Sequence, residues 1–90
     1  ESGHLALQMR NLNLSEIAQF LVGEFEVPAE VGKVSLTCRV QPGCVLQADR
    51  IQMERLLSNL ISNALKYTPH GGSVHVSLEP DGDFVRLSVR

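Results

Sequence analysis

Two asparagines, Asn59 and Asn63, stand four residues apart within the apolar stretch NLISNALKYTP, residues 59–69. Burying an unpaired amide costs roughly 1–3 kcal/mol, so each side chain must pair inside the fold or face a cleft that holds a ligand. On a helix both amides and Lys66 project to the same side. Amide oxygens suit a hard cation and a lysine suits phosphate, so the spacing indicates a magnesium–phosphate site.

An ordinary solvated helix face is the alternative, because every amphipathic helix has a wet side. Arg55 extends the polar stripe by one turn. Two features weigh against this alternative. Asparagine is a poorer helix former than glutamate, lysine or glutamine, and no acid follows Glu54 in the stripe to form a ladder of ion pairs. The pattern alone leaves both interpretations open.

The element that must position these residues is a helix over residues 49–67. Asp49 is expected to cap its first turn, with Gln52 three residues on in the arrangement of a capping box. Pro69 and the Gly71-Gly72 pair are expected to end the element. Opposite the polar side, the sequence predicts one broad apolar stripe made of Met53, Leu56, Leu57, Leu60, Ile61, Ala64 and Leu65.

The N-terminal third of the chain predicts one further helix. Residues 1–14 have no clear pattern beyond a short alternation that permits a strand. Ser15 is expected to cap a helix over residues 15–31, which has apolar residues at helical spacing. Pro28 should kink or end this helix, and Gly32 is a stop signal.

The remaining segments alternate with a period of two, which is typical of strands. A half-buried strand is expected over residues 34–40, followed by a turn at 41–43 and a short second strand at 44–46 that pairs with the first. A hairpin over 73–90 is expected after the helix. The hairpin turn is expected at Pro80, Asp81 and Gly82, and the run Asp81-Gly82-Asp83 has the composition of such a turn. The expected fold is α+β, a two-layer sandwich with helices on one face of a mainly antiparallel sheet. The last strand would have an uncovered edge.

Composition narrows the classes of function. The chain has 90 residues, a net charge of −2, 43% hydrophobic residues and only four aromatic residues, which argues for one small globular domain and against nucleic-acid binding. Cys38 and Cys44 flank the predicted turn, where a hairpin disulfide could form, although two reduced thiols are the simpler expectation. No signal peptide or membrane span is evident. The chain begins at Glu1, so we expect a piece of a longer protein.

The run ADRIQMERLLSNLISNALKYTPHGGSVHVSL resembles the N-box region of sensor histidine kinases, in ATP-binding domains of the Bergerat type that are shared with gyrase, heat-shock chaperone 90 and MutL. LNLSEIAQFLVGEF resembles the first helix of their catalytic domain, and VRLSVR the strand that leads into the glycine-rich boxes. ESGHLAL resembles the segment that follows the second dimerisation helix. The resemblance implies an incomplete Bergerat-type fold, with residues 1–14 as a lead-in from that helix.

The resemblance also implies roles for individual residues. Asn63 would give its side-chain oxygen to the Mg²⁺ that bridges the ATP phosphates, and Asn59 would support this site through water or a phosphate oxygen. Lys66 would contact phosphate. Tyr67 would lie near the ribose or adenine, although a core aromatic is the competing interpretation. Arg55 receives no role.

The implied activity is phosphoryl transfer from ATP to a histidine in the parent protein, and then to a response regulator. The histidines of the chain, His4, His70 and His75, do not resemble the phosphoacceptor, and the later glycine boxes are not seen. We therefore expect the chain alone to be inactive and to bind ATP weakly or not at all. The parent would be a cytoplasmic or membrane-anchored homodimer, with this domain in the cytoplasm.

Two other classes of function remain open. An ATPase of the same fold would place a glutamate at the position of Asn59 to activate water, and an amide cannot act as that base. A non-enzymatic module that dimerises through its uncovered edge strand is the second alternative.

Overall fold

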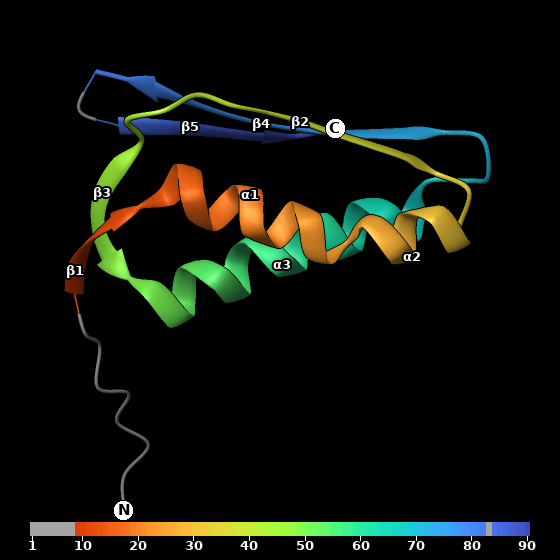
Figure 1. Ribbon diagram of the computed structural model, residues 1–90, viewed down its shortest axis with the longest axis horizontal. Coiled ribbons are helices and arrows are strands. Elements are labelled where there is room, and N and C mark those ends of the chain that lie inside the picture. Colours follow the sequence, from red (N-terminus) through yellow and green to blue (C-terminus); the bar gives the residue numbers. More distant parts are fainter. Residues whose placement is uncertain (1–8, 83) are drawn as a thin grey trace, which may run out of the picture.

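The computed structural model describes residues 9–82 and 84–90. A layer of helices lies along one face of a three-stranded sheet, and a small two-stranded sheet crosses one end of both layers (Figure 1). This arrangement confirms the predicted α+β architecture. In chain order, the elements are β1 (Met9–Asn13), α1 (Leu14–Glu24), α2 (Glu26–Val31), β2 (Ser35–Val40), β3 (Val45–Asp49), α3 (Arg50–Tyr67), β4 (Ser73–Asp81) and β5 (Phe84–Val89).

The larger sheet has the strand order β2-β4-β5, with β2 parallel to β4 and β4 antiparallel to β5. The prediction that strands 34–40 and 44–46 would form a pair was wrong. β3 instead pairs with β1 in a separate antiparallel sheet, with Leu12 opposite Leu46. Because α3 connects the two sheets, β2 and β4 are joined by a long crossover, which is the connection that parallel strands require.

Two N-terminal predictions also need correction. Residues 9–13 form strand β1 in a segment where the alternation permitted a short strand but none was assigned, whereas residues 1–8 lie outside the described part of the chain. Asn13, not Ser15, caps α1, and its side chain accepts a hydrogen bond from the Glu16 backbone N–H at 3.3 Å. Ser15 is buried; its hydroxyl donates to the Gln41 carbonyl at 2.6 Å and accepts from the Cys44 N–H at 3.3 Å. The hydroxyl therefore ties α1 to the β2–β3 connection.

The predicted helix over 15–31 is divided in two. The break falls at Phe25, three residues before Pro28, and Pro28 lies in the first turn of α2. A proline is tolerated in a first turn because its missing N–H would have no partner within the helix. Gly32 forms the C-terminal cap of α2, as predicted.

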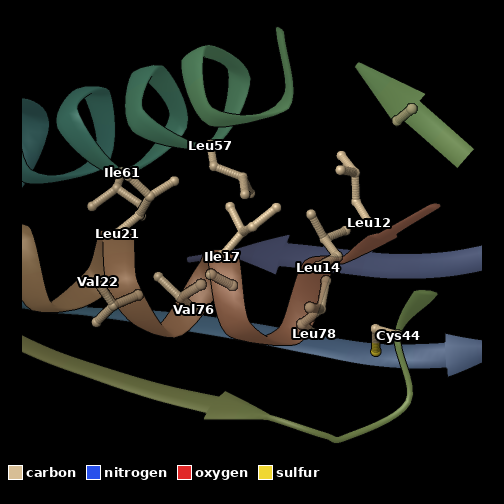
Figure 2. Packing of buried hydrophobic residues seen from close by; sticks show 12 residues of the cluster. Leu12, Leu14, Ile17, Leu21, Val22, Cys44, Leu57, Ile61, Val76 and Leu78 are labelled. Atoms are coloured by element: carbon tan, nitrogen blue, oxygen red, sulfur yellow. The ribbon is translucent and has the colours of Figure 1, made fainter. Parts of the chain in front are cut away.

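The core lies between the two layers. Leu57 and Ile61 of α3 point toward Ile17 and Leu21 of α1, and Val76 of β4 lies beneath α1 (Figure 2). Leu57 and Ile61 are each only 1% exposed, and Val76 is fully buried. This burial fixes the rotation of α3 about its axis, because the helix face that carries Leu57 and Ile61 must pack against α1 and the sheet.

The β4–β5 hairpin agrees with the sequence prediction. Asp81 and Phe84 are paired across its end, and Gly82 has φ +62°, the left-handed conformation that glycine supplies in tight turns. Gly82 therefore lies in the turn, whereas Pro80, which was expected in the turn, is paired with Val85 within the strands. Cys38 is exposed and Cys44 buried, and both are free thiols, as the simpler expectation had it.

The connection from α3 to β4 depends on Gly72. The Gly71 N–H donates to the Lys33 carbonyl at 2.8 Å, and the Ser35 N–H donates to the Gly72 carbonyl at 3.0 Å. A Cβ on Gly72 would lie 2.5 Å from the Cγ2 of Thr68 and 3.1 Å from the Pro69 carbonyl oxygen. The close approach at this position therefore requires a residue without a side chain.

Replacing Gly72 with alanine should lower the free energy of unfolding by about 1–3 kcal/mol, because the new methyl group overpacks the turn. Urea unfolding monitored by circular dichroism measures the change. Gly23→Ala is the control, since a Cβ there would meet only a carboxylate oxygen at 3.8 Å. In α1 the alanine should be neutral or stabilise by up to about 1 kcal/mol. Equal losses in both variants would contradict this account of Gly72.

Candidate functional site

Helix α3 carries the residues that the sequence marked for chemistry. Asp49 caps its first turn, because its carboxylate accepts from the Gln52 N–H at 3.0 Å, as predicted. At the other end the Thr68 hydroxyl donates to the Ala64 carbonyl at 2.7 Å. The helix is thus closed at both ends by side chains, and its buried face holds it against α1.

The structure leaves the polar side chains of α3 on an accessible face. Asn59, Asn63 and Lys66 are exposed, and Tyr67 is 76% exposed. The competing interpretation of Tyr67 as a core aromatic is therefore wrong. All four project from the C-terminal half of α3 within one face of the helix, since their spacing spans about a quarter of a turn. The helix brings them together, as the spacing predicted.

These side chains are not used to hold the fold together. Within the described residues neither the Asn59 nor the Asn63 side chain has a hydrogen-bond partner. Lys66 holds its ammonium 5.5 Å from the centroid of the Tyr67 ring, a cation–π contact worth about 0.5–1 kcal/mol at an exposed site. Two amides and one ammonium therefore keep their donors and acceptors available for a ligand.

The apolar stripe of α3 is narrower than the sequence predicted. Leu57 and Ile61 are buried and Met53 and Leu65 are partly buried against the core, but Leu56 is 47% and Leu60 37% exposed. In helical projection Leu56 and Leu60 lie between the buried centre and Asn63. The polar face is therefore bordered by exposed apolar surface. The prediction that both leucines belong to the buried stripe was therefore wrong. The helical projection alone already places them away from the centre of the stripe.

Part of this surface opens into an apolar hollow of about 290 Å³ between α3 and the sheets. Leu56 and Phe84 form exposed parts of its wall, and Phe84 is 78% exposed. Asn59, Asn63, Lys66 and Tyr67 do not line this hollow.

The donor set fits a hard cation that is shared with a polyphosphate. No group of three or more histidine, cysteine, aspartate or glutamate residues comes together in the described ranges 9–82 and 84–90. The exposed side chains of Asn59 and Asn63 offer neutral amide oxygens here. Mg²⁺ commonly binds in this way, keeping several waters and taking most of its charge compensation from phosphate oxygens. Asn63 can supply one oxygen, and Lys66 is close enough along α3 to meet the same phosphates.

The sequence matches a family model that includes most of this helix. Residues 48–90 match the family described as histidine kinase-, DNA gyrase B-, and HSP90-like ATPase. The matched segment contains α3, β4 and β5, and hence all four candidate side chains.

Curated relatives extend the similarity over nearly the whole chain. The non-motile and phage-resistance protein of Caulobacter vibrioides is 32% identical over 93 residues, a match that covers 99% of this chain and 11% of that protein. The alginate biosynthesis sensor protein KinB of Pseudomonas aeruginosa is 30% identical over 90 residues, covering 99% of this chain and 15% of KinB. The chain thus spans less than a fifth of the length of these relatives.

Solved structures share the fold. The catalytic domain of histidine kinase ThkA superimposes with a TM-score of 0.85 at 24% identity, over 92% of this chain and 57% of that one. Full-length ShkA, solved with AMPPNP, gives a TM-score of 0.81 at 21% identity, over 98% of this chain and 19% of ShkA. Residues 48–90 therefore match the histidine kinase-, DNA gyrase B- and HSP90-like ATPase family, and the chain corresponds to the N-terminal part of a histidine kinase's catalytic ATP-binding domain.

Among the helices of the described residues, none combines the length and the apolar character that a membrane crossing demands.

Proposed function

We propose that the exposed polar face of α3 forms one wall of a Mg²⁺–ATP site in a protein-histidine kinase. The amide oxygen of Asn63 binds the Mg²⁺, Asn59 supports the site through water or a phosphate oxygen, and Lys66 contacts phosphate. Tyr67 lies beside the ribose or adenine. The observation that supports this proposal most directly is that the two amides are exposed and without partners on a helix that is otherwise well capped and packed.

The residues of this chain act by positioning and by neutralising charge. Phosphoryl transfer breaks the bond between the γ-phosphorus and the bridging oxygen of ATP and forms a bond to the accepting nitrogen, with little covalent chemistry for the protein to do. Bound Mg²⁺ supplies charge neutralisation on the phosphates. Asn63 would hold the ion in one place. Lys66 adds a positive charge whose attraction for the phosphates becomes stronger as water is excluded. Nothing in this wall is a general base.

The parent protein would pass the phosphoryl group on to a response regulator and work as a homodimer in the cytoplasm, free or anchored to a membrane. One structural relative, ThkA, has been solved in complex with the response regulator TrrA, with a TM-score of 0.84 and 25% identity to this chain. This complex supports a response regulator as the partner. Residues 1–14 would be the lead-in from the dimerisation helix, and the 90-residue chain by itself would transfer no phosphate.

Incubating the parent protein with ATP labelled at the γ-phosphate tests the proposed reaction. We expect the protein to become labelled. The label should be lost in acid and retained in alkali, because a phosphorus–nitrogen bond is labile to acid and stable to alkali. Label that resists acid, or free phosphate released without labelled protein, would contradict the assignment as a histidine kinase.

An ATPase of the same fold is the second candidate, and the amide at position 59 argues against it. A carboxylate at this place on α3 could accept a proton from water, whereas Asn59 cannot. The absence of a base suits a kinase, because ATP is then not lost to hydrolysis. A non-enzymatic module that pairs through the β5 edge is a third candidate, since β5 has β4 as its neighbour and no second strand among the described residues.

Asn59→Glu in the parent protein should therefore raise the rate of ATP hydrolysis, by about 10²-fold if the new carboxylate reaches the attacking water. Phosphate release measured without a phosphoacceptor reports the rate. Asn59→Gln is the matched control, since it has the same length as glutamate but no basic oxygen. A similar rise in both variants would show that the carboxylate is not acting as a base.

A further inference from the structure

The outer face of the β2–β4–β5 sheet points away from the helices and is not used by the proposed nucleotide site (Figure 1). Alternation along the strands sends the apolar side chains of β4 inward, where Val74, Val76 and Leu78 are fully buried. The intervening side chains face outward. They are almost entirely polar: Thr37 and Arg39 on β2, His75, Ser77 and Glu79 on β4, and Arg86 and Ser88 on β5, followed by Arg90.

This face is hollowed at its centre. Ser77 of β4 is paired with Arg39 on one side and with Ser88 on the other, so two short side chains lie next to longer ones. The result is an open hollow of about 350 Å³. Its lining includes the three arginines Arg39, Arg86 and Arg90.

The charge of the hollow is opposite to that of the chain. Its lining contains three arginines and one acid, Glu79, which leaves a net charge of +2, whereas the whole chain carries −2. Arg86 is already paired, with Asp81 at 2.9 Å and Glu79 at 3.6 Å. Arg39 and Arg90 have no carboxylate partner in the part of the chain that the structure describes. Two guanidinium groups are therefore free to bind an anionic partner.

The separation of these two arginines decides what kind of anion fits. Arg39 lies on β2 and Arg90 continues β5, on opposite sides of β4. Two strand spacings, together with an offset of two residues along the strands, place their backbones about 12 Å apart. A small anion such as phosphate would meet one of them at a time, and one exposed ion pair gives at most about a fivefold gain in affinity. A peptide chain with several carboxylates can pair with both arginines at once. It then binds with higher affinity, because the second pair forms within the same complex.

We propose that this outer basic face, defined by Arg39, Ser77, Arg86, Ser88 and Arg90, docks an acidic segment of a partner protein. The carboxylates of the segment pair with Arg39 and Arg90, and its polar groups reach the hydroxyls of Ser77 and Ser88. The face lies on the opposite side of the sheet from α3, so docking leaves the nucleotide site open. The proposal therefore stands or falls independently of the proposed function.

A dye-labelled decapeptide of alternating glutamate and serine is the probe, and its fluorescence anisotropy with the purified protein reports binding. At low salt we expect saturable binding that weakens steeply as salt is added, because the pairs are exposed. The double substitution Arg39→Gln and Arg90→Gln should weaken binding about tenfold. Arg55→Gln, the same substitution at an exposed arginine of α3, should change it less than twofold.

Three outcomes would overturn the proposal. Equal binding by the double variant would show that these arginines are not the site. Inorganic phosphate that binds as tightly as the peptide would indicate a small-anion site, and binding to vesicles with anionic lipid in the absence of peptide binding would indicate a membrane surface. Circular dichroism of each variant checks that the fold is retained, and a lysine–serine decapeptide should not bind.

Discussion

Replacing Asn63 with alanine should weaken the binding of ATP in the presence of Mg²⁺ about 10- to 150-fold in the parent protein. The substitution removes an oxygen that meets a charged group, and such an interaction is worth about 1.5–3 kcal/mol. The side chain is exposed and makes no hydrogen bond within the described residues, so the protein should keep its stability. Titration calorimetry with ATP, in the presence of Mg²⁺ and then of EDTA, measures both affinities.

Asn11→Ala provides the matched control, because Asn11 is an exposed asparagine on β1, outside α3. It should leave the affinity unchanged. The loss caused by Asn63→Ala should also shrink when EDTA removes the Mg²⁺, since the amide then has no ion to hold. A loss of the same size with and without Mg²⁺ would mean that Asn63 acts on the nucleotide directly and not through the ion.

Replacing Leu57 with alanine should lower the free energy of unfolding by about 2–5 kcal/mol. Leu57 is 1% exposed and points from α3 toward Ile17 of α1, so its removal leaves a cavity between the layers (Figure 2). Small domains are stable by only about 5–15 kcal/mol, which makes this loss a large fraction of the total. Chemical denaturation gives the value, with the slope checked for a change in cooperativity.

The neighbouring residue offers a sharp comparison. Leu56→Ala removes the same atoms from a side chain that is 47% exposed, and we expect it to cost less than about 1.5 kcal/mol. The sequence prediction assigned both leucines to one apolar stripe. Equal losses from the two substitutions would mean that the rotation of α3 in the structure is wrong.

The sequence was most informative where one element carried several agreeing signals. In α3 the cap at Asp49, the buried Leu57 and Ile61 and the Gly71-Gly72 pair after the helix all pointed to the same segment. The β4–β5 hairpin was similar, because its alternation and its glycine turn specify the pairing locally. Local signals of this kind suffice because capping, amphipathic spacing and tight turns involve residues that are near in sequence.

Pairing between distant segments was not predictable. The alternation in β2 showed a half-buried strand but carried no information on its partner, and the nearest strand, β3, was the wrong choice. What decides the partner is the placement of α3, which returns the chain so that β4 lies parallel to β2. The prediction that Ser15 caps α1 failed for a related reason. The buried Ser15 hydroxyl forms hydrogen bonds with Gln41 and Cys44, which are 26 and 29 residues away.

The candidate site was predictable in its residues but not in its surroundings. Helical spacing alone placed Asn59, Asn63 and Lys66 on one face, and the structure has them together and exposed. The outer basic face was missed, although outward alternation of Arg86 and Arg90 was visible in the sequence. Its third arginine, Arg39, joins them only through the parallel pairing of β2 with β4, which sequence reasoning did not find.

The side-chain amide signal of Asn63 in a nuclear magnetic resonance spectrum tests the central claim most directly. Mn²⁺ replaces Mg²⁺ at such sites and broadens the signals of nearby nuclei. With ATP and a trace of Mn²⁺ added to the parent protein, we predict that the Asn63 amide signal broadens strongly and the Asn59 signal less, while the Asn11 signal is unchanged. If the Asn59 and Asn63 amide signals both stay sharp while nucleotide and Mn²⁺ are bound, the account is contradicted.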